Sequence, residues 1–209
     1  MEDEPPRVSS NPEPRSSRST GKVSGRPYRM RAGEKLLQSA SDLAELLAAQ
    51  DFPRVCFVGS GPLASVAKES ALKALEMTAG RVATMSETML GLRHGPMAAL
   101  EESTLFVCFV SGDGRRASYA LDLLREVDEK KIVAKRVVLG TPAQQAEIAP
   151  FCDFYLAVEA DVLDVYRPVL DVMFGQLLGL HCSIFHRLKP DALSPDGVIA
   201  RVVQEVGIY

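Results

Sequence analysis

Two hydrophobic periods alternate along the chain. Between residues 33 and 50, leucines recur at the spacing of one helical face, which predicts an amphipathic helix. Short runs rich in Val, Phe, Leu and Cys are typical of strands buried on both faces. Such strands are predicted at 55–58, 81–85, 104–112, 135–142 and 153–160. Further helices are predicted after Pro62, at about 116–127 and 165–185, and in the C-terminal stretch SPDGVIARVVQEV.

Apolar strands that alternate with helices are typical of a parallel sheet covered on both faces. The pattern therefore predicts the α/β class: a three-layer sandwich with a five-stranded, mainly parallel sheet. Small residues follow three of the strands, at 59–61, 111–112 and 140–141. In open α/β sheets ligands bind at the carboxyl ends of the strands, where helix N-termini favour anions. We therefore expect Gly59, Ser60, Gly61 and Ser111 to contact a substrate, although GSG lacks the spacing of a nucleotide-binding motif.

Residues 1–31 differ from the rest of the chain. They are rich in Pro, Ser and Arg, contain no Leu, Ile or Phe, and hold seven Lys/Arg against four acids. Such a stretch cannot bury enough apolar surface to offset the entropy of ordering it. We predict a disordered or loosely attached arm, with weak adhesion to an anionic partner as an alternative. Residues 32–209 are then a single domain.

Composition narrows the class of protein. The formal charge is −3 and the pI is about 5.7, which argues against a nucleic-acid groove. No apolar run approaches the roughly 18 residues of a membrane span, and the opening MEDEPP is unlike a signal peptide. The four cysteines are widely spaced, so neither a metal site nor a disulfide framework is expected, and a reducing cytoplasm is predicted. No cofactor is implied.

One predicted helix carries a patterned set of charges. Glu69, Lys73 and Glu76 fall at i, i+4 and i+7, so they share a face of a helix otherwise made largely of Ala and Leu. The simplest interpretation is an ordinary i,i+4 ion pair on a solvated face. The alternative is a site in which one carboxylate moves protons.

The stretch GLRHGPMAAL holds a histidine, His94, in a glycine- and proline-bounded turn. It could be a turn residue at a helix N-terminus, hydrogen-bonded to nearby backbone, or a catalyst. A carboxylate and an imidazole together at the mouth of a parallel sheet would suit isomerisation of a phosphorylated sugar. That reaction needs a base to move a proton between C1 and C2 through an enediol-like intermediate, and a group to open the ring.

The run FVGSGP…KESALKALEMTAGRV…SETMLGLRHGP resembles the sugar isomerase (SIS) domain, which has a flavodoxin-like fold. It is most similar to the second SIS domain of AgaS-like tagatose-6-phosphate ketose/aldose isomerases, some of which act as galactosamine-6-phosphate deaminase/isomerases. The ending SPDGVIARVVQEVGIY is also similar, so the resemblance covers about residues 35–209. A more distant resemblance is to the isomerase half of glucosamine-6-phosphate synthase.

The resemblance implies roles for particular residues. Glu76 matches the proton-transferring glutamate, Lys73 a residue that supports it, and His94 a ring-opening histidine that reaches a neighbouring subunit's site. A homo-oligomer, such as a homodimer, is therefore expected, with a sugar phosphate as substrate and no nucleic-acid or membrane partner. Arg201 replaces a Schiff-base lysine, and because arginine stays protonated no covalent step is carried over. The residues expected to bind substrate are Gly59, Ser60, Gly61, Glu69, Arg93, Ser111 and Arg201.

Members of this family usually carry two SIS domains, and the first supplies a Ser/Thr-rich loop for the phosphate. This chain has room for one, and its corresponding turn reads SGDGRR, where Asp113 is a poor neighbour for phosphate unless Arg115 and Arg116 compensate. A solvated turn that starts a helix is the other interpretation. Three hypotheses follow: a phosphosugar isomerase, with or without deamination; a module that binds sugar phosphates without converting them; or a truncated form that needs a partner SIS domain.

Overall fold

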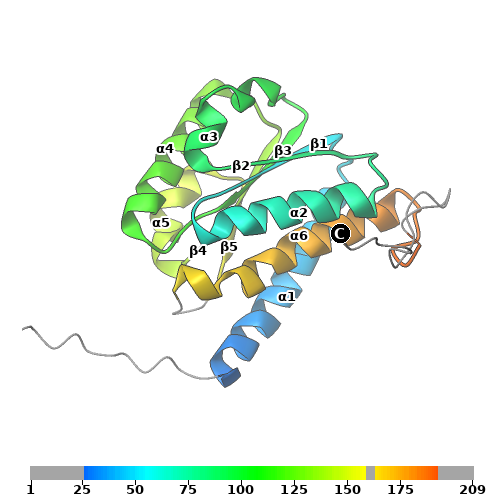
Figure 1. Cartoon of the computed structure of the whole chain (residues 1–209), viewed down its shortest axis with the longest axis horizontal. Helices are drawn as coiled ribbons and strands as arrows, with labels where there is room; N and C mark the ends of the chain where they lie inside the picture. The colour runs from blue at the N-terminus through cyan, green and yellow to red at the C-terminus, as the bar shows by residue number, and fades with distance from the viewer. Residues whose placement is uncertain (1–25, 159–162, 193–209) are drawn as a thin grey trace, which may run out of the picture.

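A computed structural model of the chain describes residues 26–158 and 163–192 (Figure 1). Within these residues the main elements alternate between strands and helices. The strands are β1 (Arg54–Gly59), β2 (Ala83–Glu87), β3 (Thr104–Phe109), β4 (Lys135–Gly140) and β5 (Phe154–Ala157). The α-helices are α1 (Arg26–Ala48), α2 (Pro62–Met77), α3 (Met89–Arg93), α4 (Gly114–Lys130), α5 (Gln145–Ile148) and α6 (Pro168–Phe185). The 3-10 helices are η1 (Pro96–Ala99), η2 (Pro142–Gln144), η3 (Ala149–Phe151) and η4 (Asp164–Tyr166).

The five strands form one sheet in the order β2-β1-β3-β4-β5, and every neighbouring pair is parallel. The chain order reverses between β1 and β3, where Gly59 lies opposite Phe109. The turns that follow these two strands therefore lie side by side at the carboxyl edge of the sheet. In doubly wound sheets this switch point is the usual place for a ligand.

Helices cover both faces of the sheet, which confirms the predicted three-layer α/β sandwich. Alternate residues of β1 point to opposite faces, as the two-residue period of a strand requires. Val55 and Phe57 join a core with α1, α2 and α6, whereas Cys56 and Val58 join a second core with α3, α4 and α5. Figure 1 shows α2 and α6 running side by side, with α1 beyond them.

Helix α6 is the most apolar of the long helices α1, α2, α4 and α6. By length and composition alone it could cross a membrane, contrary to the expectation that no apolar run is long enough. In the structure it packs against α1 and α2, as the core helix of a globular domain does. Buried residues such as Leu170, Phe174 and Leu178 place it in the first core.

The boundaries differ from the predicted ones in several places. Helix α1 begins at Arg26, so residues 26–31 of the predicted arm are helical, and Pro27 stands in the first turn, where its missing N–H costs nothing. The second strand lies at 83–87 instead of 81–85. The short helices α3 and α5 were not predicted, because four or five residues carry too little periodicity. Residues 1–25 and the predicted C-terminal helix lie outside the described residues.

Candidate functional site

The three charged residues of α2 form one ion-pair cluster. Lys73 Nζ lies 2.8 Å from Glu76 Oε2 and 3.6 Å from Glu69 Oε1. The Lys73 and Glu76 side chains are each 32% exposed, so both meet solvent while their stems rest on the helix surface. The hydrogen bond to Glu76 is the main reason that the pKa of Lys73 is raised above its ordinary value. The predicted sharing of a face is therefore confirmed, and Lys73 positions both carboxylates.

Close packing against α6 fixes the backbone of this helix. Gly175 faces Ser70, and a Cβ at Gly179 would lie 3.2 Å from the carbonyl oxygen of Lys73. The two glycines stand four residues apart, on one face of α6. Because neither glycine has a side chain, α2 approaches α6 closely at the turn that carries Lys73. The backbone beneath the charged cluster is therefore packed directly against α6.

The turn after β1 begins α2 at the carboxyl edge of the sheet. A side chain at Gly59 would collide with the carbonyl of Leu63, and Gly61 has a φ of 59°, a conformation that favours glycine. Ser60 Oγ accepts a hydrogen bond from the backbone N–H of Met89 at 3.4 Å, which ties the turn to the start of α3. The guanidinium of Arg116 lies beside Gly61.

His94 directly follows the short helix α3 as its C-cap residue, and its backbone N–H donates to the carbonyl of Gly91 at 3.0 Å. Gly95 and the 3-10 helix η1 come next, so the interpretation of His94 as a turn residue bonded to nearby backbone describes its main chain. Its side chain is exposed. Arg93 beside it donates to Glu126 of α4 at 2.7 Å, and Glu126 also accepts from Lys130.

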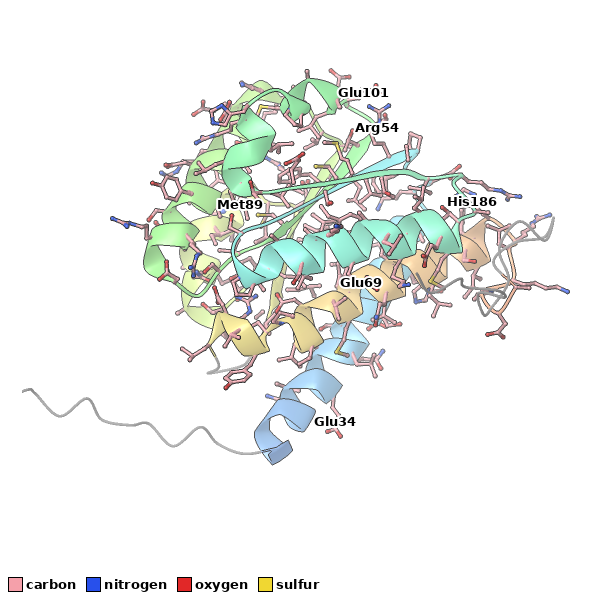
Figure 2. The ribbon with its side chains drawn as sticks, viewed as in Figure 1. Glu34, Arg54, Glu69, Met89, Glu101 and His186 are labelled. Atoms are coloured by element: carbon pink, nitrogen blue, oxygen red, sulfur yellow. The ribbon has the colours of Figure 1, made fainter. Side chains whose placement is uncertain are left out.

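The structure does not bring Glu76 and His94 together at the mouth of the sheet. Glu76 lies in the last turn of α2, about 22 Å along the helix from Gly61 at a rise of 1.5 Å per residue. Helix α2 packs on the face of the first core, whereas α3 packs on the face of the second. Figure 2 shows Glu69 on α2, Met89 at the carboxyl end of the strands, and Arg54 with Glu101 at the opposite end. Sequence spacing does not reveal which face each element covers, and the resemblance placed His94 in a neighbouring subunit's site, so the roles of Glu76 and His94 stay predictions.

The turn after β3, for which a phosphate contact and a helix start were both considered, leads directly into helix α4. Asp113 caps α4, since its side chain accepts from the backbone N–H of Arg116 at 3.0 Å, which confirms the helix-start interpretation. Ser111 is buried, and its hydroxyl donates to the carboxylate of Asp164 while accepting from the N–H of Asp113. Ser111 was expected to bind substrate, and in the structure its hydroxyl proton is donated to Asp164.

Asp164, Arg167 and Asp171 are functional candidates that the sequence analysis missed. Arg167 and Asp171 are 1% and 0% exposed and form a bidentate ion pair, with Nη2–Oδ1 at 2.5 Å and Nε–Oδ2 at 3.1 Å. Burial raises the pKa of Asp171, and Arg167 offsets part of that rise. A sequence signal for these residues did exist: three charged residues, spaced i, i+3 and i+7, stand just before and within the first turn of an otherwise apolar helix. Arg201, by contrast, lies outside the described residues.

No family model matches the chain. It is 35% identical over 185 residues to a candidate D-galactosamine-6-phosphate deaminase AgaS of Streptomyces coelicolor, an alignment that covers 86% of this chain and 47% of that protein. Its fold is similar to a candidate tagatose-6-phosphate ketose/aldose isomerase of Clostridium novyi (TM-score 0.79, 31% identity, 87% and 47% of the two chains). A tagatose-6-phosphate ketose/aldose isomerase of Escherichia coli is also similar (TM-score 0.71, 29% identity, 85% and 47%).

The parallel sheet, the GSGP turn and the E-x-x-x-K-x-x-E helix define the chain as a sugar isomerase (SIS) domain. Within that class it is an AgaS-like domain, as the similarity over more than four-fifths of its length shows. The chain spans about half the length of the relatives it matches.

Proposed function

We propose that this chain is part of a phosphosugar aldose–ketose isomerase of the tagatose-6-phosphate or galactosamine-6-phosphate type. The observation that supports it best is the cluster on α2, in which the partly exposed carboxylate of Glu76 lies 2.8 Å from the ammonium of Lys73. The names of the similar proteins supply the substrate class.

In the proposed reaction the carboxylate of Glu76 takes the proton from C2 of the open-chain aldose. The carbonyl oxygen at C1 gains a proton as the enediol-like intermediate forms. Protonated Glu76 then returns its proton to C1, the hydroxyl at C2 loses its proton, and the product is the ketose. Lys73 orients the carboxylate of Glu76, and Glu69 holds Lys73 in place. With a 2-amino sugar the same proton shift leaves an imine at C2, which one water hydrolyses to the ketose and ammonia.

His94 would serve as the acid that protonates the ring oxygen and opens the sugar. Because α2 and α3 cover opposite faces of the sheet, we do not propose that His94 and Glu76 of one chain act on the same sugar. The proposal therefore includes a second copy of the chain, or another SIS domain, that contributes His94, holds the phosphate, or does both. Assembly as a homo-oligomer and a cytoplasmic location belong to this proposal.

Incubation of the protein with tagatose 6-phosphate and with galactosamine 6-phosphate, followed by assays for the ketose and for ammonia, tests the reaction. Glu76→Gln removes the base and should abolish turnover. Glu129→Gln, an exposed acid on α4, is the matched control and should leave turnover unchanged. Turnover that survives Glu76→Gln would contradict the assignment of the base. A rise in melting temperature with hexose phosphates and no turnover would favour the binding module instead.

Mixed assemblies test where His94 acts. Glu76→Gln and His94→Asn are each expected to be inactive. If sites form between two copies, equal mixing gives hybrids in which one of two sites has both native residues, which restores about a quarter of the activity. No recovery in mixtures that mass measurement shows to contain hybrids would refute a site shared between copies.

A further inference from the structure

The turn between β3 and α4 is occupied by a carboxylate of the protein itself. Asp164, in η4, accepts the hydroxyl of Ser111 on Oδ2 and the backbone N–H of Gly112 on Oδ1, the latter at 2.9 Å. Two guanidinium groups complete its surroundings. Arg116 and Arg167 each lie 4.0 Å from one of its oxygens.

These four donors are the kind that hold a phosphate group. A serine hydroxyl, a backbone N–H, two arginines and the N-terminus of a long helix gather at the carboxyl edge of a parallel sheet, where anions bind in such folds. A cavity of about 270 Å³ opens beside the turn, lined by residues that include Gly112, Gly114 and Thr141. Removing the carboxylate of Asp164 would leave the hydroxyl of Ser111 and the N–H of Gly112 without their acceptor at a turn that this cavity adjoins.

The protein holds Asp164 in this position through a buried support. Arg167, one helical turn further on, is fixed by its bidentate pair with Asp171 and donates to the carbonyl of Val110 at 2.5 Å. Val110 directly precedes Ser111. The segment that carries Asp164 is thus fastened to the same turn that its carboxylate occupies.

We propose that Asp164 is a built-in ligand that closes the β3–α4 turn to external anions, and that this turn is a latent monophosphate site. A sugar phosphate consequently does not bind at this turn of the native domain. The inference goes beyond the proposed reaction, because it concerns a different part of the sheet and makes no use of Glu76 or His94.

The first test is a titration of the native chain with inorganic phosphate, followed by NMR of the backbone amides. The amides of Gly112 and Asp113 should show no saturable shift. A saturable shift there would overturn the proposal, whatever any variant does.

The second test removes the internal ligand. Asp164→Ala should bind inorganic phosphate at least about tenfold more tightly than the native chain, because the donors at Ser111 and Gly112 lose their acceptor. The melting temperature of this variant should rise with phosphate. Glu129→Gln, which also removes one negative charge but at an exposed position, should respond as the native chain does. If Asp164→Ala does not fold, Asp164→Asn removes the charge while keeping an acceptor for Gly112. A folded variant that binds phosphate no better than the control refutes the proposal.

Discussion

The buried ion pair between Arg167 and Asp171 offers a quantitative test of the packing at the start of α6. Replacing Arg167 with Met fills similar volume but removes the positive charge and both hydrogen bonds to Asp171. An uncompensated carboxylate would then remain at a position with no solvent exposure. Breaking such a pair costs about 3–5 kcal/mol, so we expect the free energy of unfolding to fall by that amount.

The loss should also depend on pH. Without Arg167 the opposing positive charge is lost, while burial and the nearby charge of Asp164 still raise the pKa of Asp171, so this pKa in the folded variant lies further above the unfolded value of about 3.9. The folded variant then binds more protons than the unfolded chain between these two pKa values. Lowering the pH through that window should therefore stabilise Arg167→Met, and raising it should destabilise it.

Urea denaturation at several pH values measures both effects. The control is Arg167→Met with Asp171→Leu, which removes the buried charge altogether and should recover most of the lost stability. The difference between the single and the double variant isolates the titration of Asp171. An equal loss in both variants, or a difference that does not change with pH, would refute the reasoning.

Three further predictions concern other parts of the fold. Asp113→Ala removes the cap of α4 and should cost about 1 kcal/mol in urea denaturation; an unchanged midpoint would show that the cap is dispensable. Gly175→Ala places a methyl group within 2.9 Å of Ser70 Cα and should cost about 1–3 kcal/mol, unlike Gly114→Ala, where the added Cβ meets no atom within 4 Å. Burial raises the pKa of the Cys56 thiol to about 12, so it should react with a disulfide reagent at pH 8 only after unfolding; rapid labelling of native Cys56 would contradict this.

Much of the candidate site could be predicted because its signals are local. Glu69, Lys73 and Glu76 share a helical face by spacing alone, and the structure confirms the contacts among them. Gly61 lies in the positive-φ turn that precedes Pro62, as a Gly-Ser-Gly-Pro sequence favours. These features depend on residues within one or two turns of each other.

The role of Asp164 could not be predicted in the same way. Its carboxylate meets Ser111 and Gly112 across more than fifty residues of sequence, and no spacing rule connects them. The sequence SGDGRR, taken alone, left open whether Asp113 would repel a phosphate at this turn or whether Arg115 and Arg116 would compensate for its charge. In the structure Asp113 caps its own helix, α4, and Asp164, from a distant segment, supplies the carboxylate that the turn binds.

The sequence by itself determined the class of the fold and the cluster on α2, because hydrophobic periods and helical spacing act over a few residues. Only the tertiary structure decided that α2 and α3 cover opposite faces of the sheet and that Asp164 occupies the turn after β3. Those outcomes depend on how strands are ordered and how distant side chains pack. Long-range packing is fixed by the whole core, and no short stretch of sequence encodes it.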